Sequence, residues 1–154
     1  MSQLPLSIAE RIDADLKQAM RDRDDVAKQA LRAAKTALTE ARTATENHAL
    51  SEAEAVEILQ KLAKQRRGTA AEYEKLGNPE RAQAELADVE VLDRYLPRQL
   101  SEAEVETIVR AAIAQTGATS VRAMGSVMAP AMAEIAGRAD GKLVSQIVRR
   151  LLGP

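Results

Sequence analysis

The chain has 154 residues, no Cys and a single His, which excludes disulfide bonds, thiolate metal sites and cysteine nucleophiles. Charged residues make up 29% of it and sum to a net charge of −1, which excludes a polycation that wraps nucleic acid along its whole length. No apolar run approaches the roughly 20 residues of a membrane span, and the first residues form no secretion signal. We therefore expect a soluble cytoplasmic protein.

The composition predicts an all-α fold, because alanine is abundant and no alternating strand pattern or Asn-Gly hairpin occurs. Ser7 is placed to cap a first helix. A second helix is predicted over residues 25–44. Ser51 and Glu54 have the spacing of a capping box, and they open a third helix of about 25 residues that ends at Gly77.

Asn78 and Pro79 then suit the cap and the first position of a fourth helix, which continues toward Pro97. That proline and the polar residues after it predict a domain boundary. We expect an N-terminal helical hairpin or bundle domain at residues 1–97 and a small C-terminal domain at residues 98–154.

The predicted C-terminal domain holds three helices, at residues 102–115, 120–135 and 141–152. Ser101 and Glu104 repeat the capping-box spacing at the start of the first of them. In the last helix the apolar residues fall on one face and the basic residues on the other.

The turn G-R-A-D-G before the last helix has two interpretations. In the structural one, a glycine ends one helix, an alanine packs under the turn and an aspartate caps the next helix. That interpretation assigns turn and cap roles to Gly137, Ala139, Asp140 and Gly141. In the other, Arg138 and Lys142 stand beside helix N-terminal amides that can hold a phosphate, although the Asp140 carboxylate competes for those amides.

Two groups of basic residues are candidate RNA contacts. The C-terminal group comprises Arg122, Arg138, Lys142, Arg149 and Arg150. Residues 98–154 carry seven basic and five acidic side chains, a net charge of +2, whereas residues 1–97 carry 15 and 18, a net charge of −3. This asymmetry favours the C-terminal part as the side that meets an anion.

The second group, Lys61, Lys64 and Arg67, lies near one face of the third predicted helix. Such a stripe can contact phosphates along a nucleic-acid backbone. It can equally form ion pairs with acidic residues of the same helix, namely Glu57, Glu72 and Glu74.

Nothing in the sequence has the spacing of an active site. His48 has no second His or Cys to complete a metal shell, so we expect an exposed loop residue. The carboxylate pairs lie at helix starts, where negative charge stabilises the helix dipole. Without a glycine-rich phosphate loop or a nucleophile beside a base, we predict no cofactor, no metal and no catalytic residues.

Several motifs resemble a known family. They are M-G-S-V-M from Met124, G-R-A-D-G-K-L-V-S-Q-I-V from Gly137, K-L-A-K-Q-R-R from Lys61, and V-L-D-R-Y-L-P-R-Q-L-S-E-A-E from Val91. They are similar to the YqeY family and to the related tail domain of the GatB subunit of glutamine-dependent tRNA amidotransferases. Pro130, inside the middle C-terminal helix, departs from the pattern.

The resemblance implies a bacterial accessory protein that binds tRNA or a tRNA-bound enzyme. It relates the chain to carbon–nitrogen ligases with glutamine as nitrogen donor, whose chemistry resides in other domains. One alternative is a scaffold that docks onto a protein partner, which exposed Leu and Met on the last three helices would favour. Another is an amidotransferase-like enzyme completed by a missing subunit.

Overall fold

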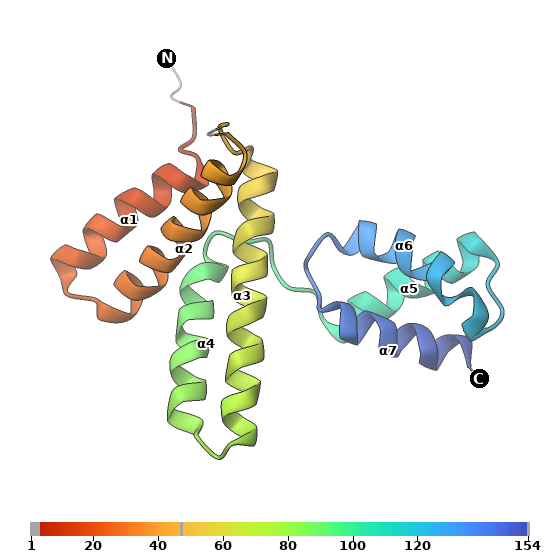
Figure 1. The fold of residues 1–154 in the computed structure, drawn as a ribbon. Helices are drawn as coiled ribbons and strands as arrows, with labels where there is room; N and C mark the ends of the chain where they lie inside the picture. Colours follow the sequence, from red (N-terminus) through yellow and green to blue (C-terminus); the bar gives the residue numbers. More distant parts are fainter. Residues whose placement is uncertain (1–3, 47, 154) are drawn as a thin grey trace. The chain divides into compact units, whose positions relative to one another are not determined.

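The structure, a computed structural model, describes residues 4–46 and 48–153. Among these residues it has seven α-helices, one 3-10 turn and no strand, which confirms the all-α prediction. The contacts divide the chain into two compact units, Met1–Leu96 and Pro97–Pro154, drawn in Figure 1. That these are independent domains with the bounds expected above stays a prediction, and residues 1–3, 47 and 154 lie outside the described residues.

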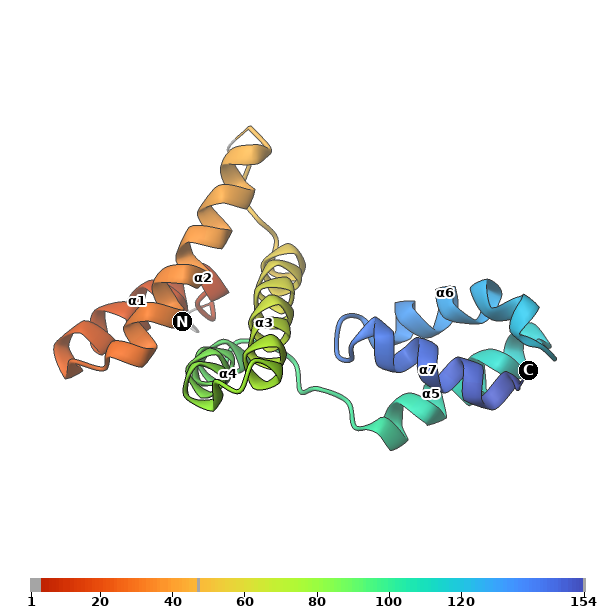
Figure 2. The same cartoon turned by 60° about the horizontal axis from the view of Figure 1, so that its bottom comes forward.

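The first unit consists of two helical hairpins (Figures 1 and 2). Its elements are α1 (Ile8–Asp22), α2 (Asp25–Ala44), α3 (Glu52–Lys75) and α4 (Pro79–Asp93). Helix α1 packs along α2, and α3 packs along α4. Because α2 also contacts both α3 and α4, the two hairpins share one core.

Side-chain hydrogen bonds cap the first turns of α1 and α3. The hydroxyl of Ser7 accepts from the Glu10 amide at 3.1 Å, and the Glu10 carboxylate accepts from the Ser7 amide at 3.3 Å. Ser51 and Glu54 repeat this capping box at α3, as predicted. Each box satisfies backbone donors that a helix start otherwise leaves unpaired.

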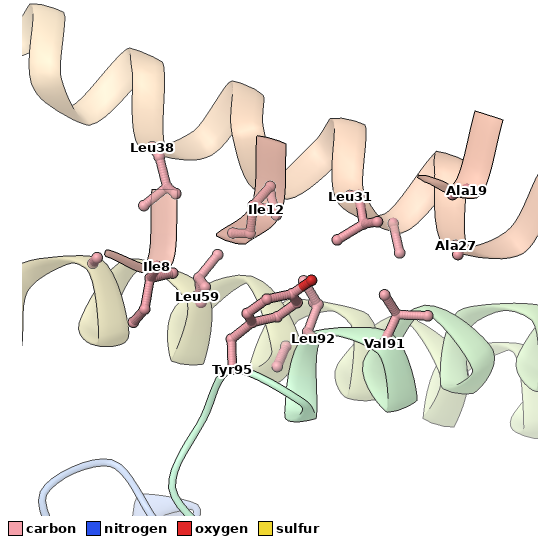
Figure 3. Packing of buried hydrophobic residues seen from close by; sticks show 14 residues of the cluster. Ile8, Ile12, Ala19, Ala27, Leu31, Leu38, Leu59, Val91, Leu92 and Tyr95 are labelled. Carbon is pink, nitrogen blue, oxygen red and sulfur yellow. The ribbon is translucent and has the colours of Figure 1, made fainter. Parts of the chain in front are cut away.

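The core of the first unit is built from aliphatic side chains and one tyrosine (Figure 3). Leu31, Leu59 and Leu92 are at most 1% exposed. The ring of Tyr95 lies among them, and its hydroxyl donates to the carboxylate of Asp15. Burial and this carboxylate raise the pKa of Tyr95. This hydrogen bond links the segment just after α4 to α1.

Among the described residues of this unit, one carboxylate is buried. Asp88 of α4 is 3% exposed and accepts from the Nε2 atom of the Gln29 side chain at 3.4 Å, while the Arg66 guanidinium lies 3.9 Å away. Burial raises the pKa of Asp88, against the opposing charge of Arg66. Sequence reasoning missed this group, since it lies beside Val89 on the apolar face of α4.

The second unit is a three-helix arrangement around a core of its own. Its elements are α5 (Glu102–Thr116), the 3-10 turn η1 (Val121–Ala123), α6 (Met124–Ile135) and α7 (Gly141–Leu152). The side chains at its centre are fully buried, among them Val105, Val109, Val127, Ile135, Val144 and Val148. Helix α7 has the predicted bounds, whereas the predicted helix 120–135 begins as η1.

In this unit the structure shows the course of the helix at Pro130, which the sequence left open, and it corrects one local prediction. Pro130 neither ends nor restarts a helix, because α6 continues past it to Ile135. At α5 the hydroxyl of Ser101 accepts from the Glu104 amide at 3.2 Å, but the Glu104 side chain does not complete a capping box. Its carboxylate instead takes two bonds from Arg98, at 2.8 and 2.9 Å, because a bidentate guanidinium is a stronger donor than one amide.

Candidate nucleic-acid interface

The turn between α6 and α7 holds two left-handed residues. Helix α6 ends at Ile135, and Ala136 follows with φ 48° and ψ 50°. Its amide donates to the Met132 carbonyl at 3.0 Å. The helix is therefore closed one residue before Gly137, which has φ 80° and was expected to close it.

The Arg138 side chain lies back against the end of α6. Its Nε donates to the Ile135 carbonyl at 2.9 Å and its Nη2 to the Glu134 carbonyl at 2.8 Å. The last carbonyls of a helix lack intrahelical donors, and this guanidinium supplies two. Arg138, one of the candidate RNA contacts, is thus only partly available to a ligand.

The start of α7 is capped from within the chain. The carboxylate of Asp140 accepts from the Lys142 amide at 3.1 Å, and the Asp140 carbonyl accepts from the Val144 amide at 3.1 Å. Ala139 packs against the core of the unit beneath the turn. A phosphate at these amides would compete with the Asp140 carboxylate, as the sequence indicated.

The exposed face of α7 is basic, but one of its arginines is already paired. Arg150 forms an ion pair with Glu106 at 3.0 Å and another with Glu102 at 3.6 Å. Glu106 also binds Arg110 at 2.8 Å, and these two arginines lower the pKa of Glu106. Arg150 therefore contributes little net positive charge to the surface.

Three basic side chains of the second unit remain. Arg122, Lys142 and Arg149 are exposed, and within residues 97–153 none of the three forms an ion pair. Lys142 and Arg149 are seven residues apart, which brings them to the same side of α7 after two turns. Arg122 lies on η1, which contacts both α6 and α7.

The predicted basic stripe on α3 comprises Lys61, Lys64 and Arg67, and the last of these is paired with a neighbouring helix. Lys61 and Lys64 are exposed, but the Arg67 Nη2 atom lies 3.2 Å from a carboxylate oxygen of Asp93. The partner of Arg67 therefore belongs to α4 and is none of the three acidic residues of α3 that one interpretation named. Side chains from a second helix meet this face, and no sequence spacing within α3 could reveal them.

His48 is exposed and lies in the loop between α2 and α3. Its Nε2 atom is 3.3 Å from the Glu54 carboxylate, and its Nδ1 atom is 3.3 Å from the Thr45 carbonyl. The described residues hold no group of three His, Cys, Asp or Glu side chains that could bind a metal ion. Nor is any helix among them long and apolar enough to cross a membrane.

The large exposed apolar side chains all lie in the first unit among the residues described. They are Leu4, Leu6, Met20, Val26, Leu76 and Leu86. In residues 97–153 no large apolar side chain is as exposed as these, and the Leu and Met side chains of the last three helices are partly buried against the core of the second unit.

The described residues form a small all-α protein with exposed basic side chains, among them Arg122, Lys142 and Arg149 of the second unit. Residues 9–152 match the family described as Yqey-like protein, and the chain belongs to that family, which confirms the resemblance of its motifs. It is also 43% identical over 77 residues to one subunit of the glutamyl-tRNA(Gln) amidotransferase of Thermococcus gammatolerans. That similarity covers 47% of this chain and 12% of the relative, so the chain spans a small part of it.

Proposed function

We propose that this protein binds tRNA through phosphate contacts on its second unit and serves as an accessory of glutamine-dependent tRNA amidotransferase machinery. The observation that carries the proposal is the set of three exposed basic side chains on α7 and η1, Arg122, Lys142 and Arg149, without ion pairs in residues 97–153. The similarity to part of a glutamyl-tRNA(Gln) amidotransferase subunit supports tRNA as the ligand class.

The physical basis is counterion release. Each basic side chain that neutralises a phosphate frees a condensed cation, so such contacts favour binding at low salt. An arginine already paired with glutamates, such as Arg150, contributes less to this binding, because its ion pairs must first be broken. We therefore assign the main contacts to Arg122, Lys142 and Arg149, and a supporting role to Lys61 on α3.

We assign the chemistry to a partner enzyme. Carbon–nitrogen ligation with glutamine as donor needs an activated nucleophile and a phosphate-binding loop, and the sequence has the spacing of neither. The chain has few aromatic residues to stack on bases, 1% in all. Recognition would then follow the shape and phosphates of folded RNA.

The test is binding of the full chain to unfractionated tRNA over a series of salt concentrations. Affinity is expected to fall as salt rises, and the triple variant Arg122→Glu, Lys142→Glu, Arg149→Glu is expected to lose binding. A matched control is Lys17→Glu, Arg21→Glu, Arg32→Glu, which makes the same charge change at exposed positions of the first unit. It should retain most of the affinity.

The result that contradicts the proposal is absent or salt-insensitive binding of the unmodified chain. Equal losses in the two triple variants would instead assign the effect to overall charge and remove the second unit as the site. Absent or salt-insensitive binding would favour the protein-docking alternative.

A further inference from the structure

The G-R-A-D-G turn has a role that phosphate binding does not explain. Its arginine, Arg138, is half-buried and uses two guanidinium nitrogens on consecutive carbonyls of α6, those of Glu134 and Ile135. The forked geometry of guanidinium matches this pair of acceptors, and a cation at a helix C-terminus also opposes the negative end of the helix dipole.

The backbone of Arg138 makes two more contacts. Its amide donates to the Ile135 carbonyl at 3.1 Å, and its carbonyl accepts from the Leu100 amide at 2.8 Å. Leu100 precedes α5 and packs against the core of the second unit. One residue therefore joins the end of α6, the turn and the segment that enters α5.

The position of Lys142 depends on this turn. Asp140, two residues after Arg138, caps α7, and Lys142 is the second residue of that helix. Two residues of the turn, Ala136 and Gly137, have positive φ values. Glycine adopts such a conformation without strain, but alanine does not, so the turn needs outside contacts to hold Ala136 there, and those of Arg138 supply them.

From these contacts we infer that Arg138 is a positioning residue, which holds the α6 to α7 turn and thereby presents Lys142, and that it does not itself contact RNA. The inference rests on the function proposed above. A phosphate bound by the same guanidinium would have to displace the bonds to the Glu134 and Ile135 carbonyls. Those carbonyls would then lose their side-chain donors.

Arg138→Lys separates positioning of the turn from phosphate binding. Lysine keeps the positive charge but lacks the forked guanidinium that reaches two carbonyls. Affinity for unfractionated tRNA is measured with the full chain, at a temperature where circular dichroism shows each variant to be folded. If Arg138 positions the turn, Arg138→Lys and Arg138→Ala lose affinity alike, by roughly the threefold to tenfold of one phosphate contact. If it binds phosphate as a charge, Arg138→Lys retains the affinity and the inference is overturned.

A double-mutant cycle identifies the residue through which Arg138 acts. Arg138→Ala should have little further effect in a Lys142→Ala chain, yet it should multiply the loss caused by Arg149→Ala. If the loss of affinity in the Arg138→Ala, Lys142→Ala double variant equalled the product of the two single losses, the inference would be contradicted. Failure of the unmodified chain to bind tRNA would instead contradict the proposed function, and the inference with it.

Discussion

Ala136 occupies a backbone conformation that alanine disfavours. Its φ of 48° lies in the left-handed region, where a Cβ atom costs about 1 kcal/mol or more, and its side chain is exposed. Ala136→Gly should therefore raise the free energy of unfolding by about 1 kcal/mol, measured by urea titration. Ala133→Gly, at an exposed helical position of α6, should lower it by about as much. An unchanged or lower stability of Ala136→Gly would show that the turn is not strained there.

Glu104 predicts a pH dependence of stability. The Arg98 guanidinium lowers the pKa of Glu104 from 4.5 to about 2 in the folded chain. A carboxylate whose pKa is depressed by folding stabilises the fold above its unfolded pKa, and this stabilisation is lost as the pH falls from 4.5 toward 2.

The variant Glu104→Gln should accordingly be less stable than the unmodified chain at pH 7, and the difference should shrink between pH 4.5 and pH 2. Urea titrations over this range measure it. Glu134→Gln serves as the control, because within residues 97–153 that exposed carboxylate forms no ion pair. A constant difference at all pH values would exclude the ion pair as the cause.

Helix α3 contains a glycine with no structural need for one. Gly68 lies inside the helix, is exposed, and has no atom within 4 Å of the position that a Cβ would take. Gly68→Ala should stabilise the chain by about 0.5–1 kcal/mol in urea titration. The matched variant Ala71→Gly, exposed in the same helix, should destabilise it similarly. A loss of stability in Gly68→Ala would indicate a contact that the structure does not contain.

Helix starts could be predicted from sequence because their chemistry is local. Ser7, Ser51 and Asn78 find their partners three residues away, so a single window contains the whole interaction. Glu104 shows the limit of this reasoning, since Arg98 also lies within six residues and takes the carboxylate from the capping box. Spacing identifies possible partners but does not rank them.

The candidate site could be predicted only in outline. Net charge by segment indicated the C-terminal part, but not which basic side chains remain available there. Arg150 meets Glu106 from another helix, 44 residues away in sequence. Arg138 binds backbone carbonyls, which a count of charges does not include. Both outcomes depend on how α5, α6 and α7 pack together.

In the second unit, ion pairs occupy some of the basic side chains and leave the others exposed. Arg98, Arg110 and Arg150 are engaged with glutamates of α5. The remaining exposed basic side chains, Arg122, Lys142 and Arg149, lie on η1 and α7. A modest net charge of +2 for residues 98–154 can therefore present a local cationic surface.

The most direct test of this account is the slope of log Kobs against log salt for tRNA binding. It is compared between the unmodified chain and the variant Arg122→Gln, Lys142→Gln, Arg149→Gln. If these three side chains contact phosphates, the slope should become shallower by roughly two to three units, since each contact contributes about 0.7–0.9. Equal slopes and equal affinities in the two proteins would contradict the account.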